Sequence, residues 1–391
     1  MTQTADRLAP VLDWLHREGR LMPNMGRFID QLMLRAVAAG VPIWRFYIGL
    51  QLVHPQMLAT GFLWRRGIGF EETQRAHGIQ NTAAYIGSPM KEAREENRTV
   101  RYDLTALPAS AHEMLHDLRV GQGTDYIAFP MSVSREGPSP IASFATDREG
   151  GFDEHDLADL QRLVDGMGAV AEIYIQRSIA ETVVKTYLGR QVGQRILSGA
   201  IRRGDGEEIN AVLWFSDLRD FTGLNERLPA ADLLELLNNY LQLVGDALDA
   251  HGGEILKFIG DGVMGYFPAE DALFLPMVTA NALAAARRLI EDVEAANFAR
   301  ATGGRDPLRF GIGLHIGPVT FGNIGTQDRL DFTVIGPAVN RAARLEALTK
   351  ELKVPVCASA DFKEACTQPL VSLGRHVLRG VAEPVEVFTI P

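Results

Sequence analysis

Two aspartates stand where apolar runs of the sequence end. Asp217 closes INAVLWFSD (209–217), and Asp261 lies between two glycines within EILKFIGDGVMGYFP (254–268). The first run predicts a buried strand, and the second predicts two strands joined by a tight turn. Carboxylates presented in this way suit Mg²⁺, which takes one or two carboxylates together with substrate phosphates. The alternative is that both are ordinary turn aspartates, because Asp is common in turns.

Four longer segments carry a resemblance that decides between these interpretations. They resemble, in order, the catalytic core of class III nucleotidyl cyclases: FSDLRDFT (215–222), EILKFIGDGVMGYF (254–267), GIGLHIGPVTFGNIG (311–325) and DFTVIGPAVNRAARLE (331–346). The resemblance covers residues 208–391. It implies a ferredoxin-like α+β palm that works as a dimer and converts a nucleoside triphosphate into a 3′,5′-cyclic monophosphate and pyrophosphate.

The resemblance assigns Asp217 and Asp261 to the binding of two Mg²⁺ or Mn²⁺ ions per site. One ion would lower the pKa of the ribose 3′-hydroxyl, and both would neutralise charge on the phosphates. The backbone that follows the first strand, at Leu218, Phe221 and Thr222, would donate N–H groups to the phosphates. These residues together predict a site for a metal-bound triphosphate.

Asp220 departs from the family pattern, in which many members carry Gly at this position. A carboxylate that pointed inward would repel the phosphates, whereas one that pointed outward would be a solvated turn residue. We expect the outward orientation, because turns commonly expose Asp.

Asn340 and Arg344 lie four residues apart in VNRAAR, so on a helix they share one face. By resemblance, Asn340 would position the ribose, and Arg344 would bind the α-phosphate as negative charge develops. The family also holds the terminal phosphates with a basic residue near the C-terminus, but Val381 occupies the aligned position. Arg379 is either the replacement or a solvated strand residue, and Arg329 is another candidate for a phosphate contact.

Base selection rests on Lys257 and Thr333. A Lys ammonium can only donate hydrogen bonds, which suits adenine N1, and the Thr hydroxyl can accept from the 6-amino group. Guanine presents the opposite pattern, and guanylyl cyclases tend to carry Glu and Cys at these two positions. The resemblance therefore favours ATP and an adenylate cyclase. The alternatives are a guanylate cyclase and a catalytically weak, cyclase-like module that senses a ligand.

The chain carries both halves of the family's active site, which predicts a homodimer with two equivalent complete sites. By family geometry, the metal-binding aspartates of one protomer would meet the base-binding and transition-state residues of the other. The dimer follows from the resemblance and not from any residue pattern of this sequence.

Residues 1–152 are expected to form a separate regulatory domain. The patterns predict, in order, a helical segment over 8–39, strands at 43–53 and 57–64, helices near 89–97 and 109–119, and strands at 126–133 and 140–146. This order predicts an α+β sandwich with helices on the faces of an antiparallel sheet, similar to a GAF-type sensory domain. An unidentified small molecule or protein partner would bind there.

Residues 153–207 are expected to join this domain to the catalytic domain over 208–391. Asp153 can cap a helix in which apolar and small residues recur at alternating steps of three and four: Leu157, Leu160, Val164, Met167, Ala171, Tyr174 and Ser178. This heptad spacing predicts a signalling helix that forms a coiled coil in the dimer. The alternative is that the same face packs on its own domain, and Leu163 and Val170 offer a competing phase. A jointed, glycine-containing linker would follow.

The composition of the chain indicates which classes of partner and which cellular compartment to expect. The 391-residue chain has a formal net charge of −10, which disfavours nucleic acid and anionic membrane surfaces as partners. Its two cysteines, Cys357 and Cys366, fit reduced core thiols in the cytoplasm. An uncharged run over 46–64 is long enough to span a membrane, but its polar centre at His54 and Pro55 favours two strands, so we expect no membrane span.

One motif suggests a different enzyme. HEMLH, from His112 to His116, matches the zinc-protease signature HExxH, but no third ligand follows it and the segment fits a sensory-domain helix. His54, His77, His112 and His116 could also bind haem or a metal in the N-terminal domain. Lone histidines of this kind are more often structural, hydrogen-bonded residues.

Overall fold

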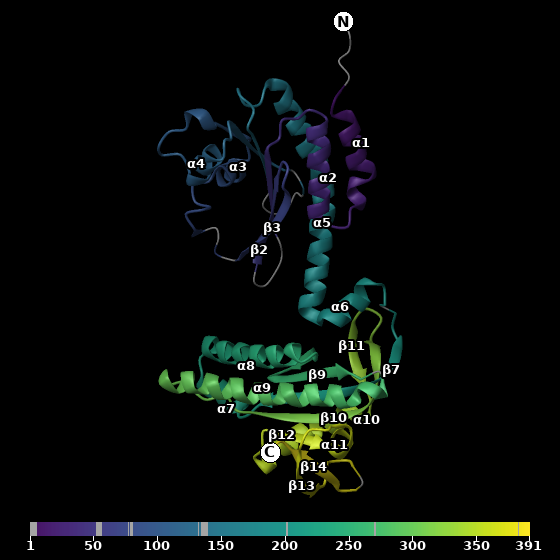
Figure 1. Cartoon of the computed structure of the whole chain (residues 1–391). Helices are drawn as coiled ribbons and strands as arrows, with labels where there is room; N and C mark the ends of the chain where they lie inside the picture. Colours follow the sequence, from purple (N-terminus) through teal and green to yellow (C-terminus); the bar gives the residue numbers. More distant parts are fainter. Residues whose placement is uncertain are drawn as a thin grey trace. The chain divides into compact units, whose positions relative to one another are not determined.

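The chain folds into two compact units. The computed structural model describes residues 6–51, 57–76, 78, 81–131, 133, 140–200, 202–269, 271–381 and 383–391. Its contacts divide the chain into Met1–Val183 and Val184–Pro391. Each unit contains one sheet and its own helices (Figure 1).

The N-terminal unit is built on a six-stranded antiparallel sheet with the order β3-β2-β1-β6-β5-β4. Its strands are β1 (Arg45–Gln51), β2 (Met57–Arg65), β3 (Gly69–Ala76), β4 (Val100–Asp103), β5 (Asp125–Pro130) and β6 (Ile141–Thr146). Its helices are α1 (Ala9–Arg17), α2 (Met25–Ala38), α3 (Pro89–Glu95), α4 (Glu113–Val120) and α5 (Glu154–Leu188). The buried apolar residues show that α1, α2 and α5 cover one face of the sheet and α3 and α4 cover the other (Figure 1).

This arrangement confirms the predicted α+β order of the unit, with one correction. The sequence predicted continuous helical structure over 8–39, but the structure contains two helices separated by a 3₁₀ turn at Gly19–Leu21. The break has a local cause, because Pro23 is followed by Asn24, whose side chain caps α2 by accepting a hydrogen bond from the N–H of Arg27. Strands β3 and β4, which the sequence patterns did not indicate, form the two edges of the sheet.

The described parts of the uncharged run over 46–64, residues 46–51 and 57–64, form paired strands. Strands β1 and β2 pair antiparallel from Arg45 opposite Arg65 to Gln51 opposite Ala59. His54 and Pro55, on which the prediction of a turn rested, lie outside the described residues.

The first half of α5 packs into the core of the N-terminal unit. Its fully buried apolar residues are Leu160, Leu163, Val164, Met167, Val170 and Ala171. Over that stretch, the predicted heptad residues and the competing set, Leu163 and Val170, therefore both pack into the core of their own unit. The interpretation that this face packs on its own domain is correct for residues 157–175, which corrects the prediction of a coiled-coil seam there.

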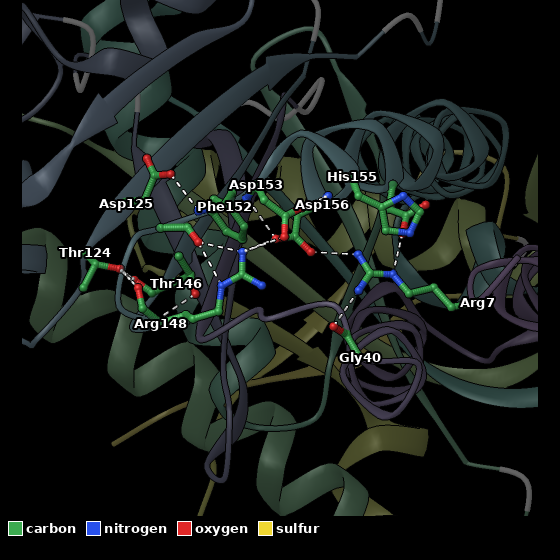
Figure 2. Close-up of polar contacts among 12 residues, drawn as sticks. Arg7, Gly40, Thr124, Asp125, Thr146, Arg148, Phe152, Asp153, His155 and Asp156 are labelled. Carbon is green, nitrogen blue, oxygen red and sulfur yellow. Dashed lines mark hydrogen bonds and ion pairs between the residues drawn. The ribbon is translucent and has the colours of Figure 1, made fainter. Parts of the chain in front are cut away.

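A buried ionic network holds the start of α5 (Figure 2). The Arg7 guanidinium donates to Asp156 and to Asp159, each at 2.7 Å, and Arg148 also pairs with Asp156. The two aspartates are 1% exposed. Buried carboxylates are tolerated only when paired and hydrogen-bonded, so this network fixes the N-terminal turns of α5 to the preceding chain.

We expect Asp156→Ala to destabilise the N-terminal unit by about 2–4 kcal/mol, because Arg7 and Arg148 would lose their shared buried partner. His155→Ala is the matched control, since that imidazole is exposed and its loss should cost about 0.5 kcal/mol or less. Urea unfolding of the full chain, followed by a probe in the N-terminal unit, measures both. Equal stability of the two variants would contradict the structural role of the network.

The C-terminal unit contains an eight-stranded sheet with the order β13-β14-β12-β10-β7-β9-β8, and β11 pairs with β10. Its strands are β7 (Gly206–Leu218), β8 (Glu254–Ile259), β9 (Gly262–Pro268), β10 (Phe310–Gly325), β11 (Leu330–Ile335), β12 (Val356–Ser359), β13 (Val371–His376) and β14 (Val385–Thr389). Its helices are α6 (Arg190–Leu197), α7 (Phe221–Arg227), α8 (Ala230–Ala250), α9 (Leu275–Thr302), α10 (Pro337–Leu352) and α11 (Ala360–Ala365). The predicted strand to Asp217 and the hairpin around Asp261 are confirmed.

Helices cover both faces of this sheet. Helices α8 and α9 contribute to the larger core together with Val212 and Trp214 of β7, whereas α10 packs on the opposite face with Ala211 and Leu213. The segment Ala272–Thr302, which includes α9, is long and apolar enough to cross a membrane by length and composition alone. One side of α9 is buried in the larger core, so we interpret it as a core helix; its buried core residues are Val278, Ala282, Leu283, Ala285, Ala286, Leu289 and Val293.

The segment predicted to be a linker packs, in part, on the C-terminal unit. Val192 of α6 is buried in the smaller core, and the side chain of Gln191 accepts a hydrogen bond from the Tyr266 hydroxyl at 2.7 Å. Helix α6 is therefore an integral element of this unit, while the first half of α5 belongs to the core of the other.

Candidate active site

Asp217 and Asp261 lie together at the end of the central strands. Strand β7 pairs with β9 up to Ser216 opposite Val263, and the β8–β9 hairpin turns between Ile259 and Gly262. A Cβ atom at position 262 would lie only 3.0 Å from Asp217 Oδ1, so Gly262 gives the carboxylate room. The two carboxylates that the sequence assigns to one site therefore lie close together within one chain.

Burial and the neighbouring Asp261 raise the proton affinity of Asp217. Burial is the largest cause, and together with the Asp261 charge and a hydrogen bond to Asp261 it raises the pKa of Asp217 to about 6. Two adjacent carboxylates with this repulsion form a site that a divalent cation neutralises, and oxygen donors suit Mg²⁺ and Mn²⁺. The donor set therefore fits the ions that the resemblance implies.

Glu346 is a third acidic group beside this pair, and the sequence analysis did not identify it. It projects from α10 and is partly buried, and burial followed by the charge of Asp217 raises its pKa to about 7. Glu346 is the last residue of the segment VNRAARLE, but the sequence pattern does not indicate which way its side chain points.

Arg219 connects the turn after β7 to α10, and it too was missed. Its guanidinium donates to the carbonyl of Phe310 at 3.1 Å and to Thr349 Oγ1 at 2.6 Å. A Cβ atom at Gly311 would lie 2.1 Å from Thr349 Oγ1 and 2.7 Å from Arg219 Nη2, so only Gly leaves room for this contact. Arg219 is also the cation that lowers the pKa of Asp217 and Glu346, against the larger effect of burial.

The turn after β7 has the form expected of a phosphate-binding turn. Leu218 is buried at the end of β7, and α7 begins at Phe221, followed by the exposed Thr222. N–H groups in the first turn of a helix have no partner within the helix and can bind anions.

Asp220 points away from this turn, as expected. Its carboxylate is 68% exposed and pairs with Arg227 of α7 at 3.4 Å. Its φ of 61° lies in the left-handed region, where Gly is favoured and Asp is tolerated. The conformation explains how Asp can replace the glycine that the family commonly carries.

The two predicted base-binding residues approach each other through tertiary structure. Lys257 of β8 forms an ion pair with Asp331 of β11, 74 positions away along the chain. Asp331 and Thr333 are two residues apart on β11 and share one face, and Thr333 is 6% exposed. The ammonium of Lys257 is therefore held beside the strand that carries Thr333, and Asp331 is a contact of Lys257 that the sequence analysis missed.

Asn340 and Arg344 lie one turn apart on α10, as predicted. The guanidinium of Arg344 lies against the backbone of Gly380, where an added Cβ atom would be 3.3 Å from Nη2. Within the described part of the chain, Arg344 has no ion pair. The neighbouring Arg379 is exposed, and Val381 is partly buried against the small core beneath it.

Two other candidate sites involve Arg329 and His112. Arg329 is exposed in the β10–β11 turn, where its N–H and carbonyl bond to Thr326, and its contact with a phosphate stays a prediction. His112 caps α4, because Nδ1 accepts from the N–H of Met114 and Nε2 lies 3.1 Å from the carbonyl oxygen of Ala83. Both ring nitrogens thus have structural partners, which contradicts a zinc-protease role. His54 and His77 lie outside the described residues.

Comparison with known proteins identifies the C-terminal unit. Residues 206–388 match the family model described as the adenylate and guanylate cyclase catalytic domain. The C-terminal unit is a nucleotide cyclase catalytic domain. This match confirms that the four sequence segments belong to a cyclase catalytic domain, and it does not distinguish adenylate from guanylate cyclases.

Individual relatives support the same family and leave the nucleotide open. The chain is 35% identical over 243 residues to an uncharacterized protein of Mycobacterium tuberculosis, covering 60% of this chain but 42% of that protein. It is 33% identical over 222 residues to the terminal-differentiation-specific adenylate cyclase of Dictyostelium discoideum, covering 54% of this chain and 10% of that protein. The chain thus spans well under half the length of these curated relatives.

Solved structures of both kinds of cyclase are also similar to the C-terminal part. The adenylyl cyclase CyaB from P. aeruginosa is 29% identical, with a TM-score of 0.44, over 48% of this chain and 96% of that one. The guanylyl cyclase Cya2 is 28% identical, with a TM-score of 0.42, over 47% of this chain and 92% of that one.

Asp217→Asn should raise the melting temperature of the metal-free cyclase domain above pH 6. The native pKa of about 6 exceeds the ordinary value of 3.8, so the folded state holds the proton more tightly and loses stability as pH rises between these values. Asn mimics the protonated form and escapes that loss, and the difference should vanish below about pH 4. Thermal unfolding across pH in chelator measures it.

Added Mg²⁺ should raise the melting temperature of the wild-type protein and have little effect on Asp217→Asn, because one ligand is gone. Asp220→Asn, at an exposed carboxylate outside the pair, should behave as wild type. A wild-type response to Mg²⁺ in Asp217→Asn would contradict the metal assignment.

Proposed function

We propose that this protein is an adenylate cyclase, which converts ATP to 3′,5′-cyclic AMP and pyrophosphate at a homodimer interface. The observation that carries the proposal is the pair of adjacent, mutually repelling carboxylates of Asp217 and Asp261 within the cyclase catalytic domain. We further propose that the N-terminal unit is a GAF-like sensory domain that controls this activity. The buried free thiols of Cys357 and Cys366 support a cytoplasmic location.

The reaction forms one bond and breaks one bond at the α-phosphorus. The ribose 3′-oxygen loses its proton and attacks, and the bond from the α-phosphorus to the pyrophosphate oxygen breaks. Two Mg²⁺ or Mn²⁺ ions held by Asp217 and Asp261 would supply Lewis acidity to the attacking and leaving oxygens. Arg344 would bind the α-phosphate as charge develops, Asn340 would orient the ribose, and the backbone from Leu218 to Thr222 would bind phosphate oxygens.

Lys257 and Thr333 support ATP as the substrate. In the nucleotide-free chain, Asp331 holds the Lys257 ammonium beside the face of β11 that carries Thr333. Such an arrangement presents a donor for adenine N1 and an acceptor for the 6-amino group. The relatives named adenylate or adenylyl cyclases agree with this choice.

Guanylate cyclase is the second candidate, and Asp331 is the observation that favours it. A carboxylate in the base pocket can accept hydrogen bonds from guanine N1–H and the 2-amino group. One solved relative is named a guanylyl cyclase. The third possibility, a cyclase-like module that binds without turnover, has less support because the described chain retains both aspartates together with Asn340 and Arg344.

Incubation of the purified protein with Mn²⁺ and either ATP or GTP, followed by identification of the cyclic product, tests the proposal directly. We expect cyclic AMP. Asp217→Ala and Asp261→Ala should each lower the rate by about 1,000-fold or more, since either change removes a ligand of the two-ion site. Asp232→Ala, at an exposed carboxylate of α8 outside the site, is the matched control. A wild-type rate from Asp217→Ala, or no product from the wild type with either nucleotide, would refute the proposal.

Lys257→Glu combined with Thr333→Cys should shift the ratio of kcat/KM for ATP over GTP by about 100-fold or more toward GTP. The change exchanges donor and acceptor in the base pocket and leaves mismatched groups unpaired with adenine. Charge reversal at Lys363 of α11, outside the site, is the control. An unchanged ratio in the double variant would mean that these residues do not contact the base.

A further inference from the structure

A cavity in the N-terminal unit lies against the second half of α5. Its volume is about 480 Å³, within the range of small-molecule sites. The start of α2, the faces of β1, β2 and β3, and α5 enclose it. All of the lining residues described belong to this one unit.

One face of the sheet forms the floor of this cavity. Leu50 lies directly opposite Thr60 on the neighbouring strand, and Phe62 lies directly opposite Glu72. Residues paired in this way project to the same side of a sheet, so the four side chains form a contiguous surface. It combines two apolar groups, one hydroxyl and one carboxylate.

One face of α5 forms the opposite wall. Tyr174, Arg177, Ser178 and Glu181 recur at steps of three, one and three, which places them on one side of a helix. One face of the helix is buried up to Ala171, and from there the helix passes along the cavity before continuing to Leu188. An occupant of the cavity would therefore add contacts to the part of α5 that has left the core.

The charges of the lining residues favour a ligand that donates hydrogen bonds or carries a positive charge. Arg177 is paired with Glu181 at 3.1 Å, whereas Glu72 has no ion pair among the residues described. The lining therefore carries one surplus negative charge. The rings of Phe62 and Tyr174 offer apolar and cation-binding faces beside it.

We propose that this cavity binds a small aromatic amine and that its occupancy regulates catalysis by fixing the second half of α5. The protonated amine pairs with Glu72, and its ring lies between Phe62 and Tyr174. The binding site stands independently of the proposed function, whereas the regulatory step rests on it.

Tryptamine is the probe, and indole-3-acetate, with the same ring and a negative charge, is its counterpart. Calorimetry on the full chain should give saturable binding of tryptamine at micromolar to millimolar concentration and binding at least tenfold weaker for indole-3-acetate. Glu72→Gln should reduce that preference, because the surplus charge is gone. Absence of tryptamine binding up to millimolar concentration, or equal binding of both probes, would overturn the proposal.

Ser178→Phe fills the cavity from α5 and should weaken tryptamine binding at least tenfold. Gln176→Phe is the control, since this exposed residue lies on the opposite side of the helix. Equal binding loss in both variants would reject the site. Light scattering provides a second check, because loss of self-association in Ser178→Phe alone would identify the cavity as a contact between two copies and overturn the small-molecule proposal.

The regulatory step has its own readout. Tryptamine should change the rate of cyclic nucleotide formation in the wild type and in Gln176→Phe, but not in Ser178→Phe. Specific binding with no change in rate would remove the regulatory step and leave the binding site. Absence of any cyclase activity, with binding that still depends on Ser178, would refute the proposed function alone.

Discussion

The repulsion between Asp217 and Asp261 is the interaction on which the catalytic unit depends. Each carboxylate alone would be an ordinary residue at a strand end. Burial and the neighbouring Asp261 together raise the pKa of Asp217 to about 6. The protein keeps this unfavourable pair at the centre of its sheet. The proposed metal ions would neutralise the same repulsion, so its relief would contribute to metal affinity.

The rest of the unit supports this pair from two directions. The turn after β7 is tied to α10 through Arg219, whose guanidinium reaches Thr349 across the space left by Gly311. Glu346 of the same helix adds a third acidic group, with its pKa raised to about 7. The turn after β7 and helix α10, which carries Asn340 and Arg344, are therefore connected within one protomer by the hydrogen bond of Arg219 and by the nearby charge of Glu346.

The N-terminal unit combines a rigid and a less covered portion of the same helix. Buried ion pairs of Asp156 and Asp159 fix the start of α5, and apolar packing holds it as far as Ala171. Beyond that point one face of the helix borders a cavity instead of a packed core. A ligand can change the packing of this portion without disturbing the core, which is the property that a signalling helix requires.

Local chemistry alone was enough to predict the two strand-end aspartates, the hairpin at Asp261, the i, i+4 pair on α10 and the sandwich order of the N-terminal unit. These features depend on hydrophobic periodicity, turn residues and helical spacing, which are written in short stretches of sequence. The helix break before Asn24 also has a local cause, although the pattern over 8–39 did not reveal it. The packing of the heptad residues and the roles of Arg219, Asp331 and Glu346 required the tertiary structure. Each of these depends on which distant segment lies opposite a side chain, as with Lys257 and Asp331, and a one-dimensional pattern does not specify that partner.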